Sequence, residues 1–303
     1  MTVAALTEQF PHPEVRFRQQ DALVMVDIEN AHGSATITTF GATLLSYRPK
    51  GGADVLWVSD AALYDGEKPV RGGVPVCWPW FGPYDPAALG PDPSDEHKKG
   101  HGIARYAFWD VESVESVGDA THVVFVLTPD DDIRKAWPLE FSLRLHVTLG
   151  EALEMTLEGE NRSDREWRVS EAFHTYFGVG EAEGLVVRGL DGTTRIDKLA
   201  DGERGTQSGD VAMTTPMEQV FVGQPGTLVI EDRDNAREIV IERENSASSV
   251  LWNPGPEGVQ SFADMPDDQY RKTVCVEVAN ALDDAYPLAA GATHAMTMRL
   301  SVR

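Results

Sequence analysis

The chain is strongly acidic, yet it has enough apolar residues to fold. It contains 303 residues, with 26 Lys and Arg against 49 Asp and Glu, a formal net charge of -23, and 42% hydrophobic residues. This composition supports a buried core and excludes an acidic disordered tail. The charge argues against nucleic acid and against an anionic membrane surface, which both require a basic patch. No apolar stretch approaches the roughly 18 residues that cross a membrane.

The termini and the cysteines indicate a cytoplasmic protein. The first residues, MTVAALTEQF, lack the basic segment and apolar run of a secretory signal. Cys77 and Cys275 are the only cysteines, which fits a reducing compartment better than a disulfide framework. No phosphate-binding or dinucleotide-binding glycine motif occurs, and His97 and His101 lie in a Pro/Gly loop. We therefore expect neither a cofactor nor a metal.

Short strand patterns dominate from end to end. The clearest is 141–149, FSLRLHVTL, where apolar and polar residues alternate perfectly, as in a strand with one buried face. The alternation resumes at 152–160, so Gly150 and Glu151 predict a hairpin turn. Similar runs predict strands at 23–29, 34–40, 54–58, 121–127, 227–231, 238–242, 272–278 and 296–302.

Helical signals are few. Residues 60–65 and 130–136 each predict one or two turns, and no window of twelve residues shows a helical period. The absence of repeats or of a compositional break predicts one all-β domain over 1–303, a large antiparallel β-sandwich or a barrel. Residues 83–100, rich in Pro and Gly, predict a long loop at the rim of a site.

Two segments beside that loop are candidates for binding. Residues 71–83, RGGVPVCWPWFGP, hold three Gly, three Pro and three aromatic residues. Such aromatic rings suit a sugar face, and equally a Trp-rich plug in the core. Beyond the loop, His101 and Arg105 flank Gly102 before a strand, where they either converge on an anion or form a solvated turn.

Two further residues are candidates for proton transfer. His174 is surrounded by Phe173, Tyr176 and Phe177, and burial of this kind tunes a histidine for acid–base work, although a hydrogen-bonded structural histidine is about equally common. Glu277 shares a strand face with Cys275 in an apolar run. A carboxylate is rarely buried without a partner or a task, and the alternative is a charge on an edge strand.

Taken together, these segments resemble a known family. The runs RGGVPVCWPWFGP, HGIAR, FHTYFGVG, Ile196-Asp197-Lys198 and VCVEVAN occur in that order between residues 71 and 280. They resemble the glucose-6-phosphate 1-epimerases, the hexose-phosphate mutarotase branch of the aldose 1-epimerase superfamily. The resemblance extends from about residue 20 to the C-terminus.

The resemblance implies a galactose-mutarotase-like β-sandwich with a sugar site on a concave sheet face. It implies roles for six residues: His174 as the catalytic acid, Glu277 as the catalytic base, Arg71 and Arg105 as phosphate ligands, Asp197 as a ligand of sugar hydroxyls, and His101 as a lining residue. One position departs from the family, since Gly100 stands where a Gln is frequent.

The implied reaction interconverts the α and β anomers of a hexose 6-phosphate, such as glucose 6-phosphate. In it Glu277 takes the proton of the C1 hydroxyl and protonated His174 delivers one to the ring oxygen, with no cofactor or metal. Two alternatives stay open: an aldose 1-epimerase for neutral sugars, and a non-catalytic carbohydrate-binding protein. The partner is a small sugar phosphate, and the oligomeric state is not fixed by the sequence, with a monomer favoured.

Overall fold

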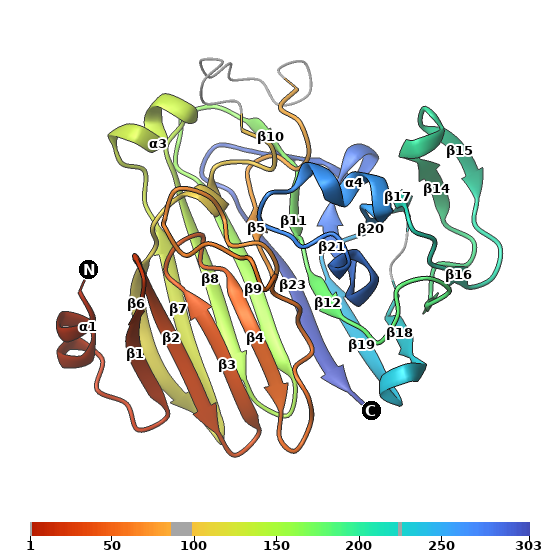
Figure 1. Cartoon of the computed structure of the whole chain (residues 1–303). Coiled ribbons are helices and arrows are strands. Elements are labelled where there is room, and N and C mark those ends of the chain that lie inside the picture. Colours follow the sequence, from red (N-terminus) through yellow and green to blue (C-terminus); the bar gives the residue numbers. More distant parts are fainter. Residues whose placement is uncertain (1, 86–98, 224–225) are drawn as a thin grey trace.

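Alternating apolar side chains arrange the strands in two facing layers (Figure 1). The computed structural model describes residues 2–85, 99–223 and 226–303. One layer is a nine-stranded antiparallel sheet, whose strands are, in spatial order, β16 (Val211–Ala212), β13 (Val186–Arg188), β18 (Leu228–Asp232), β19 (Arg237–Glu244), β23 (Thr293–Val302), β9 (Leu153–Asn161), β8 (Phe141–Leu149), β7 (Ala120–Leu127) and β6 (Asp110–Val117).

The second layer carries the site. Its main sheet contains, in spatial order, β15 (Glu203–Thr206), β14 (Thr194–Asp197), β17 (Met217–Val222), β20 (Ser248–Asn253), β21 (Thr273–Asn280), β11 (Glu171–Phe173) and β5 (Val76–Cys77), with β12 (Tyr176–Gly178) also paired to β21. Isolated bridges from Leu44 to Val74 and from Leu56 to Phe177 extend this layer into a four-stranded sheet of β1 (Val15–Gln20), β2 (Leu23–Asn30), β3 (Gly33–Thr38) and β4 (Leu44–Pro49).

The core fills the space between the layers. In Figure 1, β1–β4 lie over β6–β9, and β2 contacts β7 while β3 contacts β8. A single cluster of buried apolar side chains runs from Leu6 to Leu300 and includes the tryptophans Trp78, Trp80, Trp109, Trp137 and Trp167. A short sheet of β10 (Trp167–Val169) and β22 (Tyr286–Leu288) lies beside them. An all-β sandwich of the predicted class is confirmed.

The strand predictions hold best where alternation is strict. Leu149 lies opposite Leu153 across the predicted hairpin of β8 and β9, and every second residue of 141–149 is buried as expected. The predicted strand at 54–58 is wrong, because Leu56 and Val58 make only isolated bridges. The loop predicted over 83–100 lies largely outside the described residues.

The helix predictions are half right. The segment 130–136 is confirmed as α3 (Asp131–Ala136), which begins where the Asp130 carboxylate accepts from the amides of Asp132 and Ile133. No helix forms at 60–65, because the carbonyl of Tyr64 accepts a hydrogen bond from the amide of Ala22 instead (3.1 Å).

The remaining helices are short. The described residues add α1 (Val3–Gln9), which the sequence did not suggest, α4 (Gly255–Gly258), and the 3-10 turns η2 (Ala104–Tyr106), η3 (Lys198–Ala200), η4 (Arg233–Asn235), η5 (Val259–Ser261), η6 (Gln269–Lys272) and η7 (Leu282–Asp284). None of these helices is long and apolar enough to cross a membrane.

Gly102 fixes the loop that carries His101 against the sheet. It has a φ of +78°, and a Cβ there would overlap the carbonyl group of Trp78, which accepts the Ile103 amide at 2.9 Å. We expect Gly102→Ala to lower the free energy of unfolding by more than the roughly 1–2 kcal/mol of left-handed strain alone. Chemical denaturation measures this loss.

Gly100→Ala is the matched control, two residues away. A Cβ there meets nothing within 4 Å, and its φ lies outside the left-handed range. Equal stability of the two variants would contradict the role assigned to Gly102.

Candidate active site

A cavity of about 480 Å³ opens on the outer face of the eight-stranded sheet. Five of the six residues singled out in the sequence line it, and they come from four separate segments of the chain: Arg71, His101, Arg105, His174 and Glu277. Gly82, Pro83 and Gly100 also line it, so both ends of the predicted rim loop reach the cavity. The sixth residue, Asp197, is not part of the lining.

Glu277 lies at the centre of the sheet. On β21, Val274, Val276 and Val278 belong to the core between the layers, so Cys275 and Glu277 face the other way. Since β21 pairs with β20 on one side and with β11 and β12 on the other, an edge position is excluded. The Glu277 side chain is only 1% exposed, and its Oε2 atom has no hydrogen-bond partner.

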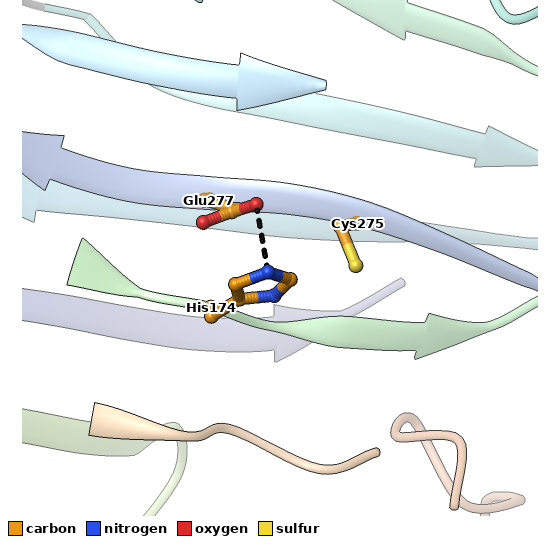
Figure 2. A group of neighbouring side chains, drawn as sticks. All are labelled: His174, Cys275 and Glu277. Atoms are coloured by element: carbon orange, nitrogen blue, oxygen red, sulfur yellow. Dashed lines mark ion pairs between the residues drawn. The ribbon is translucent and has the colours of Figure 1, made fainter. Parts of the chain in front are cut away.

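His174 occupies the break between β11 and β12. Its backbone amide donates to the Pro75 carbonyl oxygen at 3.0 Å, and its ring stacks on Tyr176 with centroids 4.9 Å apart and an interplanar angle of 13°. The ring is thereby aimed at Glu277, with Nε2 3.6 Å from Oε1 (Figure 2). The two predicted proton-transfer groups therefore face each other, buried, at the floor of the cavity.

Burial pushes both groups toward their neutral forms. It lowers the pKa of His174 well below its usual range, and the positive charges of Arg105 and Arg71 lower it further. Burial likewise raises the pKa of Glu277 well above its usual range; Arg105 opposes this shift and the carboxylate of Glu218 adds to it. These shifts favour the neutral pair over the ion pair.

Two arginines place positive charge on the cavity wall. Arg71 Nε lies 3.1 Å from Asp264 Oδ1, and its guanidinium lies 4.5 Å from the centroid of the Phe262 ring. Arg105, in η2, is 9% exposed and makes no ion pair with any other described residue, while its Nε has no hydrogen-bond partner. Arg105 is therefore the less compensated of the two cations.

His101 is held as a neutral hydrogen-bond donor. Burial, with Arg105 and Arg71 nearby, lowers its pKa to about 3. Its Nδ1 accepts from the Gly82 amide at 3.3 Å, so the proton of the neutral ring is on Nε2. The ring lies 5.3 Å from that of His174, centroid to centroid.

The strand register places Glu218, not Asp197, in the cavity. Ile196 pairs with Val220 and Asp197 with Gln219, so Asp197 lies on the face opposite to Glu218 and Val220, which both line the cavity. The Asp197 carboxylate instead accepts from Gln219 Nε2 at 2.8 Å and from the Leu199 amide at 3.0 Å. The sequence interpretation missed Glu218, although the alternation of 217–222 puts it on the same face as Val220.

Aromatic rings line the rest of the cavity, and of the three that the sequence suggested in residues 71–83 only Phe81 is among them. Trp78 and Trp80 are fully buried in the core, so the Trp-rich plug is the correct description of these two residues. The rings that line the cavity belong to Phe81, Tyr106, Tyr176, Trp252 and Phe262. They provide apolar walls for the C–H faces of a sugar.

One group of side chains has the composition of a metal site. Ligand atoms of His174, Cys275 and Glu277 all lie within 4.8 Å of one another, and all three residues are buried (Figure 2). The other described residues contain no comparable group of three His, Cys, Asp or Glu side chains.

Comparisons with known proteins agree with this geometry. The family model "Aldose 1-epimerase" matches residues 24–301. The chain is 35% identical over 271 residues to an Escherichia coli (strain K12) protein provisionally named a glucose-6-phosphate 1-epimerase, which covers 89% of this chain and 87% of that protein. A Cenchrus ciliaris protein with the same provisional name is 29% identical over 255 residues, covering 81% of this chain and 74% of its own.

A solved structure shows the same fold. The crystal structure of a provisionally named mutarotase from Salmonella typhimurium superimposes with a TM-score of 0.86 at 29% identity, covering 96% of this chain and 94% of that one. The fold is therefore galactose-mutarotase-like, as expected. The chain belongs to the aldose 1-epimerase family, and it is an enzyme that interconverts the α and β anomers of a sugar.

Proposed function

We propose that the substrate is a hexose 6-phosphate, with glucose 6-phosphate as the natural choice, and that His174 and Glu277 carry out the chemistry. The observation that carries the proposal is the cavity itself, where a buried His–Glu pair lies beside Arg71 and Arg105. Arginine is suited to bind phosphate through charge-assisted hydrogen bonds, and a neutral sugar needs no such cations. The names of the relatives point to the same substrate.

Anomer exchange needs two proton transfers in each direction. Glu277 removes the proton of the C1 hydroxyl while His174 protonates the ring oxygen, so the ring opens to the aldehyde. Rotation about the C1–C2 bond presents the other face of the carbonyl, and the same two groups then act in reverse to close the ring. Each positioned transfer is worth about 10²–10⁴-fold in rate.

The number of protons held by His174 and Glu277 together fits this scheme. A neutral His174 with a protonated Glu277 holds as many protons as the reactive ion pair, so the two states differ by one transfer between Nε2 and Oε1, which lie 3.6 Å apart. The enzyme therefore needs an interaction that favours the charged histidine when substrate is bound.

The substrate phosphate supplies that interaction. Arg105 and Arg71 lower the pKa of His174 in the empty cavity, and a phosphate dianion bound to them cancels much of their positive potential. Binding thereby raises the pKa of His174, which both arginines lower, and also that of Glu277, which Arg105 lowers. Because Arg71 acts on His174 and not on Glu277 in this way, the phosphate favours the protonated histidine. Phosphate recognition and acid catalysis are coupled through the same two cations.

The sugar hydroxyls need acceptors as well. We assign this role to Glu218, because its carboxylate faces the cavity, and we assign to Asp197 the support of β17 through Gln219. This replaces the role that the family resemblance implied for Asp197.

We also propose that the chain is a single domain that acts as a monomer in the cytoplasm. The continuous core cluster through both layers supports one domain. Two free, buried cysteines suit a reducing compartment.

Removal of either proton-transfer group abolishes most of the rate. We expect His174→Ala and Glu277→Gln each to lower kcat by about 10²–10⁴-fold, measured by exchange NMR of the anomeric signals of glucose 6-phosphate. Unchanged circular dichroism and retained sugar-phosphate binding by calorimetry are the controls. A folded His174→Ala variant with near-normal kcat would exclude this mechanism. Tight binding without faster exchange by the wild type would favour the non-catalytic alternative.

The phosphate affects kcat as well as KM. We expect glucose to react with a lower kcat than glucose 6-phosphate, because it carries no phosphate to cancel the positive potential of Arg71 and Arg105 at His174. Arg105→Met should reduce kcat/KM for glucose 6-phosphate by about 10–100-fold, the value of one charge-assisted contact. It should not reduce kcat/KM for glucose, because it removes a positive charge that lowers the pKa of His174. Equal kcat/KM for both sugars in the wild type would identify a neutral-sugar epimerase instead.

Glu218 and Asp197 are separable by mutation. Glu218→Gln removes a negative charge that raises the pKa of Glu277, so the acidic limb of the kcat/KM profile, where the base becomes protonated, should move to lower pH while KM rises. Asp197→Asn is the matched control and should leave the limb in place, since Asp197 lies on the opposite face of the sheet. If the acidic limb of the profile moved only in Asp197→Asn, the hydroxyl-binding role would belong to Asp197 and not to Glu218.

A further inference from the structure

Cys275 has no part in the proposed chemistry, yet it lies against both reacting groups. It is fully buried beside Tyr176 and Trp57, one alternation before Glu277 on the same face of β21. One ligand atom from each of His174, Cys275 and Glu277 lies within 4.8 Å of the others (Figure 2). A thiol, an imidazole and a carboxylate form the type of donor set that zinc prefers.

The spacing suits a tetrahedral ion. Two ligand atoms about 2.1 Å from zinc at the tetrahedral angle are about 3.4 Å apart, and Nε2 and Oε1 are already 3.6 Å apart. The remaining separations are at most 4.8 Å. They exceed the roughly 3.6 Å expected between a sulfur about 2.3 Å and a nitrogen about 2.1 Å from zinc by at most about 1.2 Å. The cavity, which both His174 and Glu277 line, supplies the open fourth position for water.

Two buried polar atoms in this cluster have no hydrogen-bond partner. Glu277 Oε2 and His174 Nδ1 are buried and make no hydrogen bond, although Glu277 is only 1% exposed and His174 9%. Unsatisfied buried polar atoms are costly, and a cation bound at the Glu277 carboxylate gives Oε2 a positively charged partner. They are an observation independent of the cluster spacing.

The charges of the ligands answer the main objection, which is the proximity of Arg71 and Arg105. Zinc binding forms one bond each to sulfur, nitrogen and oxygen. The thiolate and the carboxylate that ligate the ion together carry two negative charges, which balance the two positive charges of Zn²⁺ beside the arginines.

We propose that His174, Cys275 and Glu277 form an inhibitory zinc site, in which Zn²⁺ ligates both proton-transfer groups and thereby stops anomer exchange. The site is independent of the reaction, whereas the inhibition rests on the proposed function of His174 and Glu277. Hard ions such as Mg²⁺, which prefer all-oxygen ligands, do not bind there.

The experiment measures binding and activity separately. Metal-free protein is titrated with Zn²⁺ by calorimetry, with Co²⁺ by its thiolate-to-metal absorption band, and with Zn²⁺ during exchange NMR of glucose 6-phosphate. We expect one Zn²⁺ per chain, a thiolate band with Co²⁺, and inhibition that a chelator reverses. Mg²⁺ should produce none of these.

Substitution of the thiol identifies the site. Cys275→Ala and Cys275→Ser should keep basal exchange, yet raise the Zn²⁺ concentration for half inhibition more than about 100-fold, since even the loss of a supporting outer residue costs about 10–100-fold. The pair of variants guards against misfolding of either one. Cys77→Ser tests the other buried thiol, and His146→Ala removes the pair in which His146 Nδ1 lies 3.3 Å from His122 Nε2; both should bind and respond to zinc as the wild type does.

The outcomes are distinct. Absence of zinc binding by the wild type, or binding and inhibition unaltered in both Cys275 variants, overturns the site. Binding that depends on Cys275 but leaves exchange unaffected overturns the inhibition, and with it the roles proposed for His174 and Glu277.

Discussion

The burial of Glu277 at the centre of a sheet is the constraint on which the rest of the site depends. The Glu277 carboxyl group is 1% exposed and lies within 3.6 Å of a buried histidine. Its charged form destabilises the folded protein unless a proton passes between the two groups and leaves both neutral. Three neighbouring segments place the side chains that act on this carboxyl group. The break between β11 and β12 presents His174 to it, β17 presents Glu218, and η2 presents Arg105.

The sandwich explains why these groups hold their positions. The valines of β21 are anchored in the core between the layers, so the strand cannot rotate without exposing them. His174 is fixed by the hydrogen bond from its backbone amide to the Pro75 carbonyl oxygen and by the Tyr176 ring. Glu277 is thus attached to a rigid strand and His174 to the short break between two strands, whereas Arg71 and Arg105 are on connecting segments. The arrangement is typical of enzymes in which loops vary and scaffolds persist.

The sequence predicted the fold well wherever one face of a strand is buried, because period-two alternation reports this directly, as in 141–149. It failed at 54–58 and 60–65, where non-local hydrogen bonds such as that between Ala22 and Tyr64 decide the backbone. His174 and Glu277 are far apart in the chain. The family resemblance, and not any local pattern, predicted that they lie in one site. The sequence did not reveal that Glu218 faces the cavity while Asp197 lies on the other face of the sheet, because pairing register is a tertiary property.

The enclosure of Arg71 and Arg105 has a kinetic consequence for a chain with a net charge of -23. A phosphorylated sugar approaching from bulk solution meets a negative surface first, and at physiological salt it senses the two guanidinium groups only within about 8 Å. Salt therefore assists the encounter by screening the repulsion, in contrast to enzymes that steer anions with an exposed basic patch. For the proposed sugar phosphate, selectivity then depends on how slowly the bound sugar dissociates.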